Sequence, residues 1–185
     1  MPEPLLRPWQ DDDAAALRSA VVTTPDLVTQ LPVAALDTHD ACAAFIGEHL
    51  TPSRDGGRNL AIVLDGVAVG NVGMSAVDRR HGTAWVFYWV AASARGRGLA
   101  ARALSTVAAH ALDPAGDDLF RLELGHRVNN PASCAVATRA GFVAEGVERA
   151  KLAYGSERFD VETHARLRTD PAPSTPPLEV GPGVW

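Results

Sequence analysis

Two arginines and two glycines alternate in the segment Arg95-Gly96-Arg97-Gly98, between an aromatic, β-branched run and a run rich in alanine and leucine. The order strand, glycine-rich loop, helix places unpaired backbone N–H groups and the positive end of the helix dipole beside the loop. Glycine lets the backbone approach a ligand closely, and the arginine fork matches phosphate oxygens. The segment therefore predicts a pyrophosphate-binding site. The alternative is a basic surface turn in front of a helix.

The spacing of the glycines narrows the choice of phosphate ligand. No Walker run of two glycines followed by Lys and Ser or Thr is present. A dinucleotide fingerprint can be matched only as the short run Gly96-x-Gly98-x-x-Ala101. In contrast, Arg95-x-x-Gly98-x-Ala100 resembles the Arg/Gln-x-x-Gly-x-Gly/Ala signature of the GCN5-related N-acetyltransferases (the GNAT superfamily), in which this loop binds the pyrophosphate of coenzyme A.

Further segments resemble the RimJ/RimL-like branch of that superfamily. They are Asn130-Pro131-Ala132-Ser133, Arg139-Ala140-Gly141-Phe142 with Glu145-Gly146, Leu6-Arg7-Pro8-Trp9 and Arg158-Phe159-Asp160-Val161, in the expected order over about residues 4–168. The resemblance implies an N-acetyltransferase that uses acetyl-CoA as a substrate. It also implies an α/β (α+β) GNAT fold, in which about four helices flank a mixed, mostly antiparallel twisted sheet of about seven strands that splay at the acetyl-CoA site.

The resemblance assigns roles to individual residues. It places the coenzyme A site at Trp89, Val90, Ala91, Arg95, Gly96, Arg97, Gly98, Leu99, Ala100, Asn130, Ser133 and Arg139. The backbone N–H of Val90 would stabilise the oxyanion of the thioester. A plain core strand is the alternative for Tyr88-Trp89-Val90, because a backbone role leaves no side-chain signature. Ser133 would protonate the leaving thiolate, and its alternative role is an N-terminal helix cap.

The general base is less well defined, because many relatives carry Glu where this chain has Trp85. The remaining candidates are His126, Asp78, Glu123 and His81, or a chain of water molecules. His126 ends the strand before Asn130, and its ordinary pKa suits base chemistry at neutral pH. Its alternative is a surface histidine at a strand end.

Bulk properties limit the classes of partner. The net charge of −5 argues against nucleic acid. Cys42 and Cys134 are too few and too isolated for a disulfide framework or a zinc site, so no metal is expected, and Cys134 is expected to be a small buried helix residue. Without an apolar leader or a membrane-length apolar run, we expect a cytoplasmic protein with no membrane contact. The resemblance also allows a homodimer.

The positions of the expected elements follow from periodicity and turn residues. Strands are predicted at 5–9, 59–64, 67–77, 83–91, 121–126, 142–152 and 158–167, and helices at 11–22, 38–50, 98–112 and 132–140. Residues 23–37 are expected to form a loop with one short helical turn. The domain is predicted to span residues 1–168, followed by a proline-rich tail, 169–185, with polyproline character and a frayed end.

The acceptor is predicted to be a primary amine, either a protein N-terminal α-amine or a small molecule. Its choice would depend on residues 23–37, the second helix and the last hairpin. Trp85, Phe87 and Trp89 share one face of their strand, which either borders the acceptor cleft or belongs to the core. Two other functions stay open: a coenzyme A sensor without turnover, and an interaction protein that docks through its tail.

Overall fold

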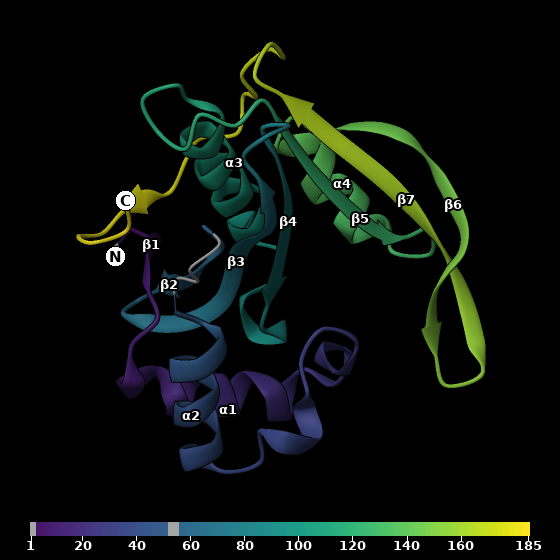
Figure 1. Cartoon of the computed structure of the whole chain (residues 1–185). Helices are drawn as coiled ribbons and strands as arrows, with labels where there is room; N and C mark the ends of the chain where they lie inside the picture. The colour runs from purple at the N-terminus through teal and green to yellow at the C-terminus, as the bar shows by residue number, and fades with distance from the viewer. Residues whose placement is uncertain (1–2, 52–55) are drawn as a thin grey trace.

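The computed structural model describes residues 3–51 and 56–185. Its central feature is one eight-stranded sheet, in the order β6-β7-β5-β4-β3-β2-β1-β8 (Figure 1). The strands are β1 (Leu5–Pro8), β2 (Arg58–Leu64), β3 (Val67–Asp78), β4 (Thr83–Val90), β5 (Arg121–Arg127), β6 (Val143–Tyr154), β7 (Glu157–Leu167) and β8 (Glu179–Val180). The α-helices are α1 (Ala14–Thr23), α2 (His39–His49), α3 (Leu99–Leu112) and α4 (Pro131–Arg139). The predicted fold class and the order of its elements are confirmed.

Short 3₁₀ turns complete the chain path. They are Asp11–Asp13, Pro25–Thr29, Val33–Ala35 and Ala92–Ala94. The segment 23–37 therefore holds two short turns, η2 (Pro25–Thr29) and η3 (Val33–Ala35), where the sequence predicts one. The β2–β3 hairpin turns at Asp65 and Gly66, both with positive φ, as a two-residue hairpin of the favoured hand requires.

Side chains that alternate along the strands supply a core on each face of the sheet. One cluster joins α1, α2 and η2 to strand residues such as Ala61 and Trp89. On the other face, α3 and α4 pack against Val86, Leu122 and Leu124. Because residues i and i+2 of a strand share a face, the two faces of β4 belong to two different helix layers. A ligand bound beside β4 would therefore lie between the α1–α2 layer and the α3–α4 layer.

Strands β4 and β5 separate along their length. They pair in parallel only from Thr83 to Trp85 of β4, against Arg121 to Glu123 of β5. Beyond Trp85, β4 continues to Val90 with its register to β3 intact. The last part of β4 therefore keeps one strand neighbour and faces an opening on its other edge. The predicted splay is confirmed.

The C-terminal tail packs against the domain, and the expectation of a frayed end is wrong. Strand β8 pairs in parallel with β1, and Leu178 is 3% exposed among side chains of β1, β2 and α3. Trp185 stacks on His110 with ring centroids 3.9 Å apart. The tail is ordered for two reasons: the edge of β1 offers backbone groups for β8 to pair with, and burial of the apolar Leu178 side chain stabilises the packed state. The proline content of the tail indicates neither of these contacts.

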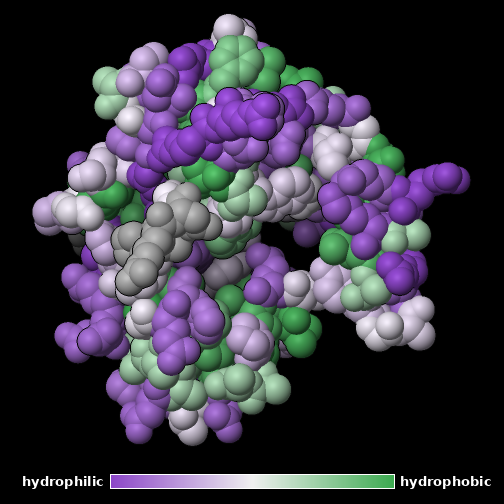
Figure 2. All heavy atoms as spheres, viewed as in Figure 1, coloured by the Kyte–Doolittle hydropathy of each residue, from purple (hydrophilic) through white to green (hydrophobic). Residues whose placement is uncertain are grey.

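The β6–β7 hairpin extends away from the body of the sheet (Figure 1). Nearly every residue of β6 is exposed. Figure 2 shows the molecule hollowed beside this hairpin. Within the described residues, no helix is long and apolar enough to cross a membrane.

Candidate functional site

A pocket of about 320 Å³ opens between the end of β4, the loop before α3 and the helix α4. It brings together most of the residues that the sequence assigns to coenzyme A, although they come from segments about forty residues apart. Those that line it are Trp89, Val90, Arg95, Gly96, Gly98, Leu99, Ala100, Asn130, Ser133 and Arg139. Ala91, which is buried, and Arg97, which is exposed, do not line the pocket.

The loop presents open backbone to the pocket. Gly96 and Gly98 have φ of +76° and +73°, and an added Cβ would meet nothing within 4 Å at either position. Gly98 is also the N-cap residue of α3 and supplies no side-chain cap. The first N–H groups of α3 therefore have neither an intrahelical partner nor a capping side chain. This geometry suits an anion such as pyrophosphate.

Arg95 makes contacts that its motif does not reveal. Its Nη2 donates to both carboxylate oxygens of Asp26, at 3.0 and 2.9 Å, and its Nε donates to the Val90 carbonyl at 2.9 Å. Asp26 lies in η2 and lines the same pocket. Arg95 thus fastens η2 to the end of β4, and its guanidinium also neutralises a carboxylate that would otherwise repel a bound phosphate.

The Val90 amide faces the opening between β4 and β5. The next amide, Ala91 N–H, donates to the Val69 carbonyl of β3 at 2.8 Å. Successive N–H groups of a strand point to opposite edges, so the Val90 N–H points away from β3. The Val90 carbonyl lies on that same edge, where Arg95 reaches it. Since β5 has already diverged, no strand of the described residues pairs with this part of the edge.

Ser133 lies in the first turn of α4, hydrogen-bonded to a tyrosine of β4. The hydroxyl oxygens of Ser133 and Tyr88 are 2.7 Å apart. Burial raises the pKa of Tyr88 to about 12, and the hydrogen bond to Ser133 opposes that rise. Tyr88 therefore keeps its proton at neutral pH. The helix cap is Asn130, whose Oδ1 accepts from the Ser133 N–H at 3.1 Å, so the alternative role of Ser133 as the cap residue is wrong.

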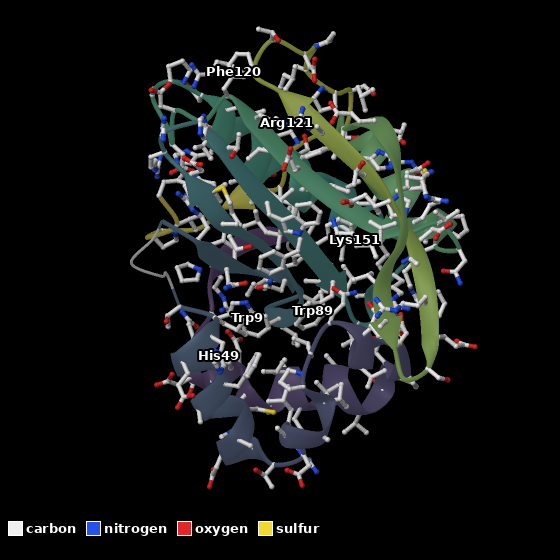
Figure 3. All side chains as sticks on the ribbon, turned by 45° about the vertical axis from the view of Figure 1, so that its right-hand side comes forward. Trp9, His49, Trp89, Phe120, Arg121 and Lys151 are labelled. Atoms are coloured by element: carbon white, nitrogen blue, oxygen red, sulfur yellow. The ribbon has the colours of Figure 1, made fainter. Side chains whose placement is uncertain are left out.

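The aromatic residues of β4 on the other face fulfil different roles. Trp89 is 4% exposed and tilts against Trp9 with ring centroids 6.0 Å apart (Figure 3). Trp85 is half-buried beneath Lys151 of β6, whose ammonium lies 5.4 Å from the ring centroid. Phe87, also half-buried, lines a second hollow of about 370 Å³ with Glu48 and residues of β2 and β3. Trp89 is therefore a core residue, whereas Trp85 and Phe87 border open space.

None of the four candidate bases lines the 320 Å³ pocket. Asp78 and His81 lie at the β3–β4 turn, near Thr83. Thr83 is seven residues from Val90 along β4, about 23 Å at ~3.3 Å per residue, so Asp78 and His81 lie at the opposite end of this strand from the Val90 amide. Glu123 accepts from Arg121 Nε at 2.6 Å.

His126 is 6% exposed, so the alternative reading of it as a surface histidine is wrong. Its ring packs beside His164 of β7. Cys134 is half-buried, against the prediction of a buried helix residue.

Several pocket residues escaped prediction from the sequence. Asp26 lies in η2 and Gln30 directly follows it, and Tyr88 belongs to the strand run for which no side-chain role was predicted. On α4 the pocket also contacts Ala132, Ala135 and Val136. Together with Ser133 and Arg139 these follow the three- and four-residue spacing of one helix face, a signal that the sequence does contain. No comparable local signal marks Asp26, because its partner Arg95 is 69 residues away.

Comparisons with known proteins agree with this architecture. Residues 5–143 match the family described as Acetyltransferase (GNAT) domain. The ribosomal-protein-serine acetyltransferase of Escherichia coli (strain K12) is 29% identical over 99 residues, which is 54% of each chain. The chain thus spans about half the length of this curated relative.

Solved structures of related proteins superpose over most of the chain. A RimL ribosomal L7/L12 α-N-protein acetyltransferase in complex with coenzyme A has a TM-score of 0.78 and 24% identity, covering 90% of this chain and 95% of that one. RimJ of Mycobacterium smegmatis, in complex with a coenzyme A disulfide, has a TM-score of 0.78 and 26% identity, covering 88% and 80%. With the splayed sheet and the glycine loop, these matches show that the chain belongs to the GNAT acetyltransferase family, in its RimJ/RimL-like branch.

Proposed function

We propose that this protein transfers the acetyl group of acetyl-CoA to a primary amine, by direct attack of the amine in a ternary complex. One observation carries the proposal. A single pocket joins an open glycine loop, a strand amide on the edge of β4 that β5 leaves, and a hydrogen-bonded serine. Those are the three groups that acetyl transfer needs: a hold on the cofactor, an oxyanion donor and a proton donor for the leaving thiolate.

Binding would start at the glycine loop. The N–H groups at the start of α3 and the positive end of its dipole would hold the pyrophosphate, with Arg139 at the opposite wall of the pocket. Asn130 and Ser133 on α4 line that wall too. The similar solved structures support this ligand, because a RimL and a RimJ are both described as complexes of coenzyme A species.

The chemical step would use the end of β4. The thioester carbonyl would accept a hydrogen bond from the Val90 N–H, which stabilises the negative charge that forms as the amine attacks. Collapse of the tetrahedral intermediate then breaks the carbon–sulfur bond and releases the thiolate. Ser133 would give its hydroxyl proton to the sulfur, and Tyr88, 2.7 Å from Ser133 Oγ, would pass its own proton to Ser133. Water would return to Tyr88 the proton that the amine releases, so that both hydroxyls end protonated.

The amine must lose a proton before or during attack. Since none of the four candidate bases lines the pocket, we infer that water carries this proton away. The absence of the four candidate bases from the lining also favours a second candidate function, a coenzyme A sensor that binds without turnover. Binding alone cannot separate the two functions, whereas product formation does.

A peptide amino terminus is the acceptor class that we favour. The curated relative is described as acting on a ribosomal-protein serine, and the RimL neighbour as an α-N-protein acetyltransferase. Trp85 and Phe87 on one face of β4 are half-buried, and Phe87 lines the hollow of about 370 Å³. A peptide could reach the pocket from that side.

Thiol release from acetyl-CoA tests the proposal. The acceptors would be a hexapeptide with a free amino-terminal serine, the same peptide with a blocked terminus, spermidine and kanamycin. Release with the free but not the blocked peptide would support the peptide assignment, and mass spectrometry would locate the acetyl group. Release with spermidine or kanamycin alone would move the acceptor to small amines. No release with any acceptor, together with tight coenzyme A binding, would refute the transferase in favour of the sensor.

A further inference from the structure

Four side chains of metal-ligand type meet beneath α4, outside the pocket lining. They are His126 of β5, Cys134 of α4, and Glu162 and His164 of β7, and their ligand atoms all lie within 4.8 Å of one another. Antiparallel pairing of β5 with β7 sets His126 opposite Glu162, and Leu124 opposite His164. Because α4 packs on the same face of β5, it adds Cys134 from above. The isolation of Cys134 in the sequence argued against a metal site, but the fold brings two histidines and a glutamate from other strands close to it.

The hydrogen bonds of the two histidines define which ring nitrogen carries the proton. His126 Nδ1 lies 3.0 Å from the Arg127 carbonyl, and His164 Nδ1 lies 3.5 Å from the Phe142 carbonyl. A carbonyl oxygen only accepts, so an Nδ1 that bonds one does so as an N–H donor; the His126 contact is short, and the His164 contact lies at the outer limit for a hydrogen bond. With the proton of each ring on Nδ1, both Nε2 atoms present lone pairs. This is the orientation that second-shell carbonyls impose on metal-binding histidines.

Those two lone pairs point at each other and at a carboxylate. The Nε2 atoms are 3.0 Å apart, and Glu162 Oε2 lies 3.0 Å from one and 3.3 Å from the other. Three acceptor atoms in van der Waals contact repel unless a positive centre lies among them. A single shared proton serves two of the three at a time, whereas one cation serves all three together with the Cys134 sulfur. The two histidines are buried, at 6% exposed for His126 and 2% for His164, whereas Cys134 and Glu162 are half-buried.

We propose that His126, Cys134, Glu162 and His164 bind one divalent zinc ion. Two imidazoles, a thiolate and a carboxylate form a donor set that zinc accepts in tetrahedral geometry. Zinc–ligand bonds of 2.0–2.1 Å would place the nitrogen and oxygen atoms about 3.3 Å apart, close to the separations present. On binding, the Cys134 thiol would lose its proton to solvent and the sulfur would bond the metal.

Four protein ligands fill the coordination of the ion, so its role would be structural rather than catalytic. It would fasten α4 to β5 and β7 at Cys134, the residue next to Ser133. The position of Ser133 against Tyr88 would then depend on the metal. This inference does not rest on acetyl transfer, since the site stands whether or not the chain turns over acetyl-CoA.

Metal binding to the full chain tests the proposal. The protein would be purified without a histidine tag, and its zinc content measured by elemental mass spectrometry. It would then be stripped by chelator and titrated with Co²⁺, which reports thiolate ligation through a charge-transfer absorption. We expect about one equivalent of metal, the thiolate band, and a lower Tm after stripping. A wild-type protein that binds neither zinc nor Co²⁺ would overturn the proposal and leave a shared-proton network.

Two cysteine variants sharpen the test, because the chain has only two cysteines. Cys134→Ser should lose the thiolate band and bind Co²⁺ more than about 10-fold more weakly. Cys42→Ser is the matched control, because Cys42 is buried in the α1–α2 core, where its sulfur contacts the Leu36 carbonyl at 3.6 Å. It should keep both the band and the affinity. A band that persists in Cys134→Ser would contradict the assignment. If Cys134→Ser fails to fold, the wild-type titration alone decides.

Discussion

The hydrogen bond between Tyr88 and Ser133 offers a sharp test of the proposed proton transfer. The two hydroxyl oxygens are 2.7 Å apart, and either hydroxyl can donate. When Tyr88 donates, the Ser133 proton is free to point into the pocket. Tyr88→Phe removes that donor and leaves the ring in place. A net hydrogen bond is worth about 1 kcal/mol, so kcat should fall about 5-fold.

Ser133→Ala removes the proton donor itself. Loss of a general acid costs at least about 10²-fold in kcat, while coenzyme A affinity should change little because the donor acts in the transition state. If Tyr88 acts only through Ser133, the double variant should be no slower than Ser133→Ala, near 10²-fold. Independent action would give about 500-fold. The difference corresponds to a coupling of about 1 kcal/mol.

The assay is thiol release at saturating acetyl-CoA with the acceptor that the panel above selects, together with a coenzyme A titration of each variant. Ser19→Ala, an exposed serine of α1, is the matched control and should retain full activity. Multiplicative losses in the double variant would refute the coupled pair. Unchanged kcat in Ser133→Ala with a lower Tm would show that the serine is structural only.

Three further predictions concern the loop, the tail and pH. Gly98→Val should weaken coenzyme A binding at least about 10-fold, because a side chain would enter the space beside the α3 N–H groups. The matched control is Gly66→Val, because Gly66 also has positive φ and open surroundings but lies at the β2–β3 turn. Equal losses of affinity in both variants would contradict the loop assignment. Leu178→Ala should lower the free energy of unfolding by about 2–4 kcal/mol, read by denaturant titration, and a change below about 0.5 kcal/mol would mean that the tail does not pack. Burial lowers the pKa of His110, so the unfolded chain binds the proton more readily, and the stability contributed by this group is full above pH 6.5 and is lost as the pH falls below it. The Tm of wild type minus the Tm of His110→Gln should therefore decrease from pH 8 to pH 5. A difference in Tm that stays constant over this range would contradict the burial argument.

The sequence determined those parts of the site that are contiguous along the chain. β4, the glycine loop and α3 follow one another, so the run from Trp89 to Ala100 predicts a strand, a loop and a helix that meet at one point. The same holds for Asn130 and Ser133, because the cap and the third residue of a helix are local neighbours. Strand alternation and helix periodicity likewise predict the order of the elements, and the family resemblance supplied how they are arranged.

Only the tertiary structure decided the contacts between distant segments. Asp26 reaches Arg95, Tyr88 reaches Ser133, and His126 meets His164, across separations of 69, 45 and 38 residues. The tail shows the same limit. Its prolines predicted polyproline character and a frayed end, whereas β1 provides an edge for β8 and Leu178 packs in the core beside β1, β2 and α3. Local patterns report propensity and spacing, whereas these contacts depend on which faces the sheet and the helices bring together. The sheet's register places His126 opposite Glu162, and no periodicity within either strand carries that information.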